Sequence, residues 1–118
     1  MADRFEDHRG VIQDVLPGPI DCVTHISTVR DAVRGNHSHA ETWQWTWILA
    51  GRLLVVTEKD GYRKRSEHGP GEMITDEPGT IHAWKALTDC EVLVFTRGPR
   101  SGQNYEEDVQ RLEKPILT

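Results

Sequence analysis

The chain is poor in cysteine, in long apolar runs and in positive charge, and each shortage excludes a class of protein. Only two of its 118 residues are cysteines, Cys22 and Cys90, too few for a disulfide framework and at a spacing that matches no zinc motif. No segment approaches the roughly 18 apolar residues of a membrane-spanning helix. The charged start, MADRFEDHRG, does not resemble a signal peptide. We therefore expect a cytoplasmic protein with reduced cysteines and no membrane partner.

Basic residues are fewer than acidic residues in this chain. Lys and Arg total 14 against 19 Asp and Glu, which gives a formal net charge of −5. Proteins that bind nucleic acid usually carry a concentrated basic patch. The densest basic cluster, Arg63 to Arg65, is short and is followed by Glu67. We expect no nucleic-acid partner.

Helical periodicity is missing from most of the chain, whereas turn residues recur about every ten positions. Short runs rich in β-branched and aromatic residues lie between the turns, which is typical of an antiparallel sandwich or barrel. Within them, Lys59-Asp60-Gly61 is the clearest hairpin turn, because Asp-Gly suits the positive φ angles of a type I′ turn. We predict one domain over residues 1–118, with a barrel core of about 11–96 and strands near 11–15, 20–29, 36–40, 43–50, 52–57, 62–67, 72–75, 80–86 and 90–96.

The C-terminal arm, about residues 97–118, fits two structures. Asn104 could cap a short helix, with Glu107 at the capping-box position. Tyr105, Val109 and Leu112 would then share one face of that helix. The same stretch could run extended along the barrel and end at Pro115. We favour an extended arm with at most one helical turn.

Residues 34–51, RGNHSHAETWQWTWILAG, hold the densest group of chemically distinctive side chains. On a strand, alternate side chains point to opposite faces, so His37 and His39 share a face close enough to grip one metal ion. Downstream, PGEMITDEPGTIHAW places His82 three residues after Pro78-Gly79. A lone histidine pair is weak evidence for a site, and this second histidine motif strengthens it.

Residues 35–51 and 71–82 resemble the two motifs of the cupin superfamily. The resemblance implies an all-β, single-domain cupin jelly-roll barrel of antiparallel strands. It also implies a divalent transition metal (Fe, Mn, Ni, Cu or Zn) on His37, His39, Gln44 and His82. Gln44 stands where the family has a glutamate, and its neutral amide is a weaker ligand. Glu41 is the alternative carboxylate, but it falls too early, in a turn.

A second resemblance is to the nucleotide-sugar branch of the cupins, the 3,5-epimerases and 3,4-ketoisomerases. FEDHRGVI and VRGNHSH carry it. It implies a metal-free site in which His37 is the general base and Arg34 contacts the substrate phosphates through its planar guanidinium. The chain is shorter than a typical epimerase, and only Tyr62 and Tyr105 are available as a tyrosine acid.

The three tryptophans of residues 43–47 bear on a possible protein partner. If Gln44 faces the barrel interior, Thr46 does too, and Trp43, Trp45 and Trp47 face outward. Three adjacent indoles would make a large exposed apolar patch, so we expect them to be the interface of a homodimer. The competing interpretation reverses the parity and removes Gln44 from the site. Trp84, at the parity of His82, is expected to form a wall of the substrate pocket with Thr46.

Three functions stay open at this point. The first is a metal-dependent oxygenase, isomerase or lyase that acts on a small polar or carbonyl compound. The second is a metal-free epimerase or ketoisomerase of nucleotide sugars. The third is a non-catalytic module that binds a small molecule, which the fold alone does not exclude.

Overall fold

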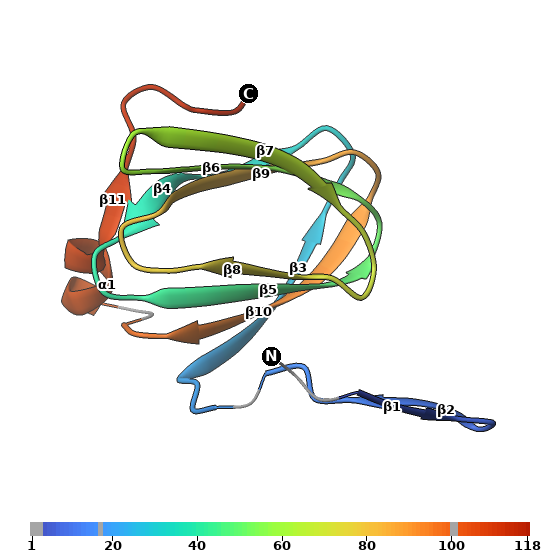
Figure 1. Ribbon diagram of the computed structural model, residues 1–118. Helices are drawn as coiled ribbons and strands as arrows, with labels where there is room; N and C mark the ends of the chain where they lie inside the picture. The colour runs from blue at the N-terminus through green and yellow to red at the C-terminus, as the bar shows by residue number, and fades with distance from the viewer. Residues whose placement is uncertain (1–3, 17, 100–101) are drawn as a thin grey trace.

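Two antiparallel β-sheets face each other across a common core. The computed structural model describes residues 4–16, 18–99 and 102–118. One sheet has the strand order β3-β10-β5-β8 and the other β11-β4-β9-β6-β7 (Figure 1). The strands are β1 (Arg4–Asp7), β2 (Gly10–Gln13), β3 (Cys22–Thr28), β4 (Val33–His39), β5 (Trp43–Ala50), β6 (Leu53–Lys59), β7 (Tyr62–His68), β8 (Met73–Asp76), β9 (Ile81–Ala86), β10 (Cys90–Arg97) and β11 (Val109–Arg111), and helix α1 spans Gly102–Asp108.

Apolar side chains fill the space between the sheets because strand alternation sends every second residue inward. Ile48 of β5 and Val92 of β10 meet Leu53 of β6, and all three are almost fully buried in one cluster. Burial of a Val, Leu or Ile side chain stabilises the fold by about 1.5–3 kcal/mol. The expected antiparallel all-β barrel is confirmed.

The predicted Asp-Gly hairpin joins β6 to β7. Lys59 pairs with Tyr62, which leaves a two-residue loop. Asp60 and Gly61 have φ angles of 52° and 77°. Both values lie in the left-handed region that a type I′ turn requires.

The N-terminal residues differ from the prediction. A strand at 11–15 was expected inside the barrel, yet the barrel begins at β3. Strands β1 and β2 form a hairpin that, within the described residues, pairs only with itself and extends away from the barrel (Figure 1). Phe5 and Ile12 of this hairpin are 58% and 70% exposed.

The C-terminal arm is neither of the two predicted structures alone. Helix α1 has seven residues, more than the single turn we favoured, and it starts at Gly102, so Asn104 lies inside it rather than at its cap. Strand β11 then pairs with β4 and becomes the edge of the five-stranded sheet. The arm therefore belongs to the barrel, and the predicted core boundary at residue 96 is too early.

The two cysteines and the helix lengths bear on the expectations drawn from composition. Cys22 is half-buried, Cys90 is buried, and both are free thiols. Across the described ranges, no helix combines the length and the apolar composition that crossing a bilayer would need.

Candidate functional site

A cavity of about 290 Å³ opens between the two sheets beside helix α1. Five strands and the helix contribute residues to its lining: β3 at the sheet edge, β4, β5, β9, β10 and α1. The lining residues are Ile26, Arg34, Gly35, His37, His39, Gln44, His82, Trp84, Val94 and Tyr105. Most of the side chains predicted from the sequence therefore meet in one place.

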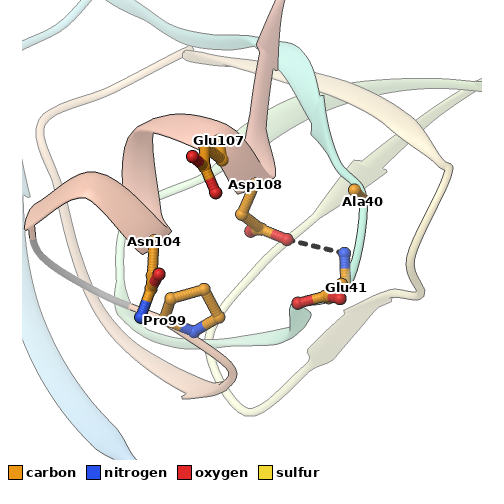
Figure 2. Close-up of a pocket in the computed structure, with 6 residues that line it drawn as sticks. All are labelled: Ala40, Glu41, Pro99, Asn104, Glu107 and Asp108. Atoms are coloured by element: carbon orange, nitrogen blue, oxygen red, sulfur yellow. Dashed lines mark hydrogen bonds between the residues drawn. The ribbon is translucent and has the colours of Figure 1, made fainter.

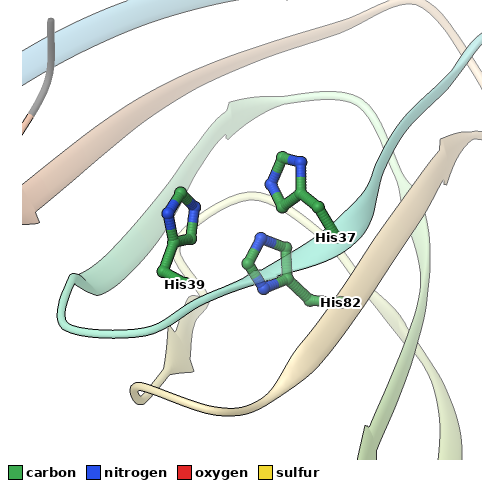
Figure 3. A group of neighbouring side chains, drawn as sticks. All are labelled: His37, His39 and His82. Carbon is green, nitrogen blue, oxygen red and sulfur yellow. The ribbon is translucent and has the colours of Figure 1, made fainter. Parts of the chain in front are cut away.

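Three imidazoles form the centre of this cavity. His37 and His39 come from alternate positions of β4, and His82 lies opposite His37 on β9. One ring nitrogen from each lies within 4.8 Å of the others, and the rings converge (Figure 3). The predicted histidine cluster is therefore present in the structure.

A β-bulge in β4 decides which side chains reach the cavity. Arg34 and His37 are three residues apart, so regular alternation would send them to opposite faces. The pairing of β4 with β9 shifts register between Gly35 and His37, and Asn36 is the extra residue. Gly35 and Asn36 take φ angles of 93° and 59°. The bulge restores Arg34 and His37 to the same cavity.

Asp108, the last residue of α1, holds His39 in place and was not predicted. Its Oδ2 accepts hydrogen bonds from His39 Nδ1 at 2.9 Å and Thr42 Oγ1 at 2.7 Å. Its Oδ1 accepts one from the Glu41 backbone N–H at 2.6 Å (Figure 2). Burial would raise the pKa of Asp108, but these hydrogen bonds outweigh it and hold the pKa below its usual range. Asp108 is therefore an ionised acceptor.

The Asp108 carboxylate fixes the tautomer of His39. Since an ionised carboxylate only accepts hydrogen bonds, Nδ1 of His39 must carry the proton. In the neutral ring the lone pair is then on Nε2, and this buried atom has no hydrogen-bond partner within the described part of the chain. His39 is only 4% exposed, and its ring is part of the cavity lining.

The other two imidazoles are weakly basic. Burial, with the neighbouring His39 and Arg111, lowers the pKa of His37 to about 4. Burial, with His37 and His39, lowers the pKa of His82 to about 3, although Nδ1 of His82 has a 3.3 Å contact with the Thr80 carbonyl oxygen. Both rings are neutral near pH 7.

A second buried carboxyl lies behind His82. Asp76 pairs with Gln44 across β8 and β5 and is 4% exposed. Its Oδ2 is 3.9 Å from His82 Nδ1, and its Oδ1 has no hydrogen-bond partner among the described residues. Burial raises the pKa of Asp76 to about 7. Asp76 was not among the residues predicted from the sequence.

The remaining predicted site residues divide into two groups. Arg34, Gln44 and Trp84 line the cavity as expected. Arg34 is anchored because its Nε donates to Thr28 Oγ1 at 2.8 Å, and its Nη2 donates to the Ser27 carbonyl at 3.1 Å. Thr46 is 1% exposed and lies outside the described lining of the cavity.

Of the two candidate tyrosines, only Tyr105 reaches the cavity. Its ring centroid is 6.5 Å from that of His39. Tyr62 is 74% exposed at the start of β7. The sequence placed Tyr105 in an arm of undecided structure, so it gave no signal that this ring faces the histidines.

A larger cavity of about 560 Å³ lies on the other side of Asp108. Ala40, Glu41, Pro99, Asn104, Glu107 and Asp108 line it (Figure 2). Glu41 is exposed there and lies outside the described lining of the histidine cavity, as its predicted position in a turn implies. The alternative carboxylate ligand is therefore not at the site.

In strand β5, Gln44 points into the barrel, as one of the two interpretations of the sequence predicts. Gln44 lines the cavity and Ile48 lies in the inner core, so the three tryptophans face outward. Trp45 is nevertheless 9% exposed, because Trp43 stacks on it at 5.8 Å and the Arg97 guanidinium lies 5.1 Å from its ring centroid. Trp43 and Trp47 are half-buried.

Comparison with known proteins gives matches at the level of structure. No protein-family model matches this chain. No curated protein sequence matches it either. Solved structures do match it, over nearly the whole chain. The fold is the cupin jelly roll.

Among the similar structures, a 3,4-ketoisomerase from Thermoanaerobacterium thermosaccharolyticum in complex with TDP has a TM-score of 0.77 and 22% identity over 95% of this chain and 85% of its own. A 3,4-ketoisomerase from Helicobacter canadensis has a TM-score of 0.77 and 18% identity, with 94% and 86% covered. A dTDP-4-dehydrorhamnose 3,5-epimerase from Sulfolobus tokodaii has a TM-score of 0.69 and 19% identity, with 96% and 77% covered. At these identities the likeness establishes the fold.

Proposed function

We propose that the protein is an isomerase or epimerase of nucleotide-linked keto-sugars, with His39 as its general base. The observation that carries this proposal is the Asp108–His39 pair: Nε2 of His39 has no hydrogen-bond partner among the described residues, and His39 lines the same cavity as Arg34. Similar structures are 3,4-ketoisomerases and a 3,5-epimerase, one of them with TDP bound, which supports the same class of substrate.

The base is assigned to His39 in place of His37, the residue predicted from the sequence. A base that takes a proton becomes an imidazolium, and a hydrogen-bonded carboxylate stabilises that charge. Asp108 gives this support to His39. His37 has a pKa of about 4. We therefore assign His37 a role in orienting the substrate.

The reaction needs one carbon acid and no redox partner. His39 removes the proton from the carbon beside the keto group, and the electron pair of the C–H bond forms an enediolate. Return of a proton to that carbon from the opposite face gives epimerisation. Protonation of the former carbonyl carbon, with transfer of the hydroxyl proton to the former carbonyl oxygen, exchanges the keto and hydroxyl positions. All electrons stay in the substrate.

Other cavity residues fit the remainder of such a substrate. Arg34 is exposed at the edge of the cavity, where a planar guanidinium can bind a diphosphate bidentately. Trp84 offers an apolar wall against the sugar. Tyr105 offers a phenol beside His39 for returning the proton.

The experiment is solvent exchange monitored by NMR. The protein is incubated with TDP-4-keto-6-deoxyglucose in D2O, and deuterium incorporation beside the keto group is measured. Exchange that depends on His39, together with formation of a keto isomer or epimer, supports the proposal. TDP binding without exchange would indicate a non-catalytic binding module, and absence of both would contradict the proposal.

A second candidate function follows from the three convergent imidazoles. The buried Nε2 atoms of His39 and His82 lack partners within the described residues, and imidazole suits divalent transition metals. His37, His39 and His82 would hold the ion, with the Gln44 amide nearby. Such an ion would supply Lewis-acid polarisation of a carbonyl. Elemental analysis of protein purified without a metal-chelating tag tests this candidate.

We also propose that the outer face of the four-stranded sheet is the interface of a homodimer. This face carries Trp43, Trp47, Leu93 and Phe95, all half-buried, with Val23 at 51% exposure. The chain has a net charge of −5, so two copies repel each other over most of their surfaces. This face also carries Arg97, which lies over Trp45, and the His25–Glu91 pair, but its other large side chains are apolar, which favours a second copy as its occupant.

A further inference from the structure

The bulge residue of β4 is tied to a segment about 80 residues away. The Oδ1 atom of Asn36 accepts hydrogen bonds from the backbone N–H groups of Ile116 at 2.9 Å and Leu117 at 3.2 Å. Its Nδ2 donates to the Leu117 carbonyl at 3.0 Å. The backbone carbonyl of Asn36 accepts from Leu112 N–H at 3.1 Å. One side chain therefore makes three hydrogen bonds to the same short segment.

Apolar packing anchors that segment on the outer face of the five-stranded sheet. Leu117 is 8% exposed and clusters with Leu54, Val56 and Ala83. Ala83 is the residue of β9 that pairs with Gly35. The packing lies directly behind the bulge, on the face opposite the cavity.

Residues 108–117, which we name the C-terminal brace, follow β4 along its whole functional stretch. Asp108 bonds the side chain of His39, and Val109 pairs with His39. Arg111 pairs with His37. The brace then reaches Asn36 through Leu112 and Leu117, and it thus contacts every residue from the bulge to His39.

We infer that Asn36 is a positioning residue, which with the C-terminal brace holds the bulge that sets Arg34 and His37 side by side in the cavity. Asn is suited to this place because it tolerates a left-handed φ of 59° better than most residues. The inference deepens the proposed function, since the distance from Arg34 to the imidazoles must match the distance from diphosphate to sugar.

We call the three hydrogen bonds of the Asn36 side chain the clamp. The test separates loss of the clamp from loss of the backbone conformation. Asn36→Gly keeps the left-handed conformation and removes all three side-chain hydrogen bonds. Asn36→Asp keeps the two bonds to the N–H groups and loses the one to the Leu117 carbonyl. Asp60→Gly, in the exposed β6–β7 turn at a φ of 52°, is the matched control for glycine at a left-handed position.

Amide hydrogen exchange measures the clamp without any substrate. We expect Asn36→Gly to speed exchange of residues 35–39 and 112–117 by about tenfold or more, since several hydrogen bonds are lost. We expect Asn36→Asp to be intermediate and Asp60→Gly to match the wild type in these segments. Unchanged exchange in Asn36→Gly would overturn the inference, whether or not the protein acts on keto-sugars.

Kinetics distinguish positioning from general stability. TDP alone needs only the Arg34 end of the cavity, whereas turnover needs both ends in register. We expect Asn36→Gly to bind TDP within about threefold of the wild type while kcat for solvent exchange falls about tenfold or more, and Asn36→Asp to recover part of kcat. Equal losses of TDP affinity and kcat would mean a merely structural role. A wild-type protein without turnover would remove the proposed function and leave the hydrogen-exchange result as the test of the clamp.

Discussion

At the scale of single residues, the Asp108 carboxylate makes a direct prediction about catalysis. Asp108→Asn keeps the shape of the side chain but removes the charge that stabilises a protonated His39. We expect kcat for solvent exchange to fall by about 10²–10⁴-fold with a much smaller change in TDP affinity. The measurement is deuterium incorporation into TDP-4-keto-6-deoxyglucose.

The control for this variant is Glu107→Gln. Glu107 precedes Asp108 on α1 but lines the larger acidic cavity. The Glu107→Gln variant should keep the wild-type kcat for solvent exchange. A wild-type rate in Asp108→Asn would remove the carboxylate from the mechanism.

Asp76 predicts how stability depends on pH. Its pKa of about 7 exceeds that of an unfolded carboxyl, so its contribution to stability falls as pH rises from about 4 to 7. His37 and His82, with pKa values of about 4 and about 3, act in the opposite sense and lower stability as pH falls below about 6.5.

Asp76→Asn should isolate the histidine contribution. We expect the variant to be more stable than the wild type at pH 8, by up to about 4 kcal/mol, and to lose that advantage below about pH 4. Urea denaturation of metal-free protein across this range measures it, with Asp60→Asn in the exposed turn as the control. A less stable variant at pH 8 would indicate that a partner stabilises the ionised form.

Gln44 gives a prediction about metal affinity. Gln44→Glu adds a carboxylate to the three imidazoles, and a charged oxygen is a stronger ligand than an amide. If the wild type binds a divalent transition metal, this variant should bind it more tightly, by about tenfold or more, as measured by isothermal titration. Weaker binding would place Gln44 outside the ligand set.

At the scale of elements, the β4 bulge can be tested through its glycine. A Cβ atom on Gly35 would lie 2.7 Å from the His82 carbonyl oxygen, at a φ of 93°. Gly61 also has a positive φ, of 77°, but a Cβ atom there meets nothing within 4 Å. We expect Gly35→Ala to cost clearly more stability than Gly61→Ala, which carries only a backbone penalty of about 1–3 kcal/mol. Equal losses in urea denaturation would mean that β4 and β9 have room to separate.

The same element shows what the sequence could predict and what it could not. Period-two alternation identified β5 and placed Gln44 inside and the tryptophans outside, because a regular strand has one parity. A bulge changes parity within a strand, and Asn36 looks like any other strand position in the sequence. Arg34 and His37 were therefore assigned to one site by resemblance and not by geometry.

Long-range partners were also beyond the sequence argument. Asp108 is one of three consecutive acidic residues in the run YEEDVQ, and nothing local distinguishes it from the other two. It meets His39 because α1 ends against β4. The β1–β2 hairpin was missed because its charged residues do not alternate with apolar ones as barrel strands do. The turn at Asp60-Gly61, by contrast, is local chemistry and was predicted correctly.

At the scale of the whole molecule, the outer face of the four-stranded sheet predicts the oligomeric state. Trp47→Glu puts a carboxylate in the middle of that face, where burial of an unpaired charge costs several kcal/mol, on the order of 3–5. Light scattering should show a dimer for the wild type and a monomer for the variant. Trp45 is less suitable, since Arg97 and Trp43 already cover it within one chain.

A matched control for the oligomeric state is Tyr62→Glu. Tyr62 is 74% exposed on β7, in the other sheet. This variant should keep the wild-type assembly. A monomeric wild type at micromolar concentration would exclude the interface, while the inward positions of Gln44 and Ile48 would still define which face of β5 points inward.

The attachment of the C-terminal brace to β4 also sets the order of events when the protein is made. His39 and Asp108 are 69 positions apart, and Asn36 and Leu117 are 81 apart. A nascent chain emerges from its N-terminus, so β4 leaves the ribosome long before the residues that complete its site. Contacts between such distant positions also close slowly. The barrel can thus begin to fold while His39 still lacks its Asp108 partner, and the proposed site is completed only after α1 and β11 have emerged.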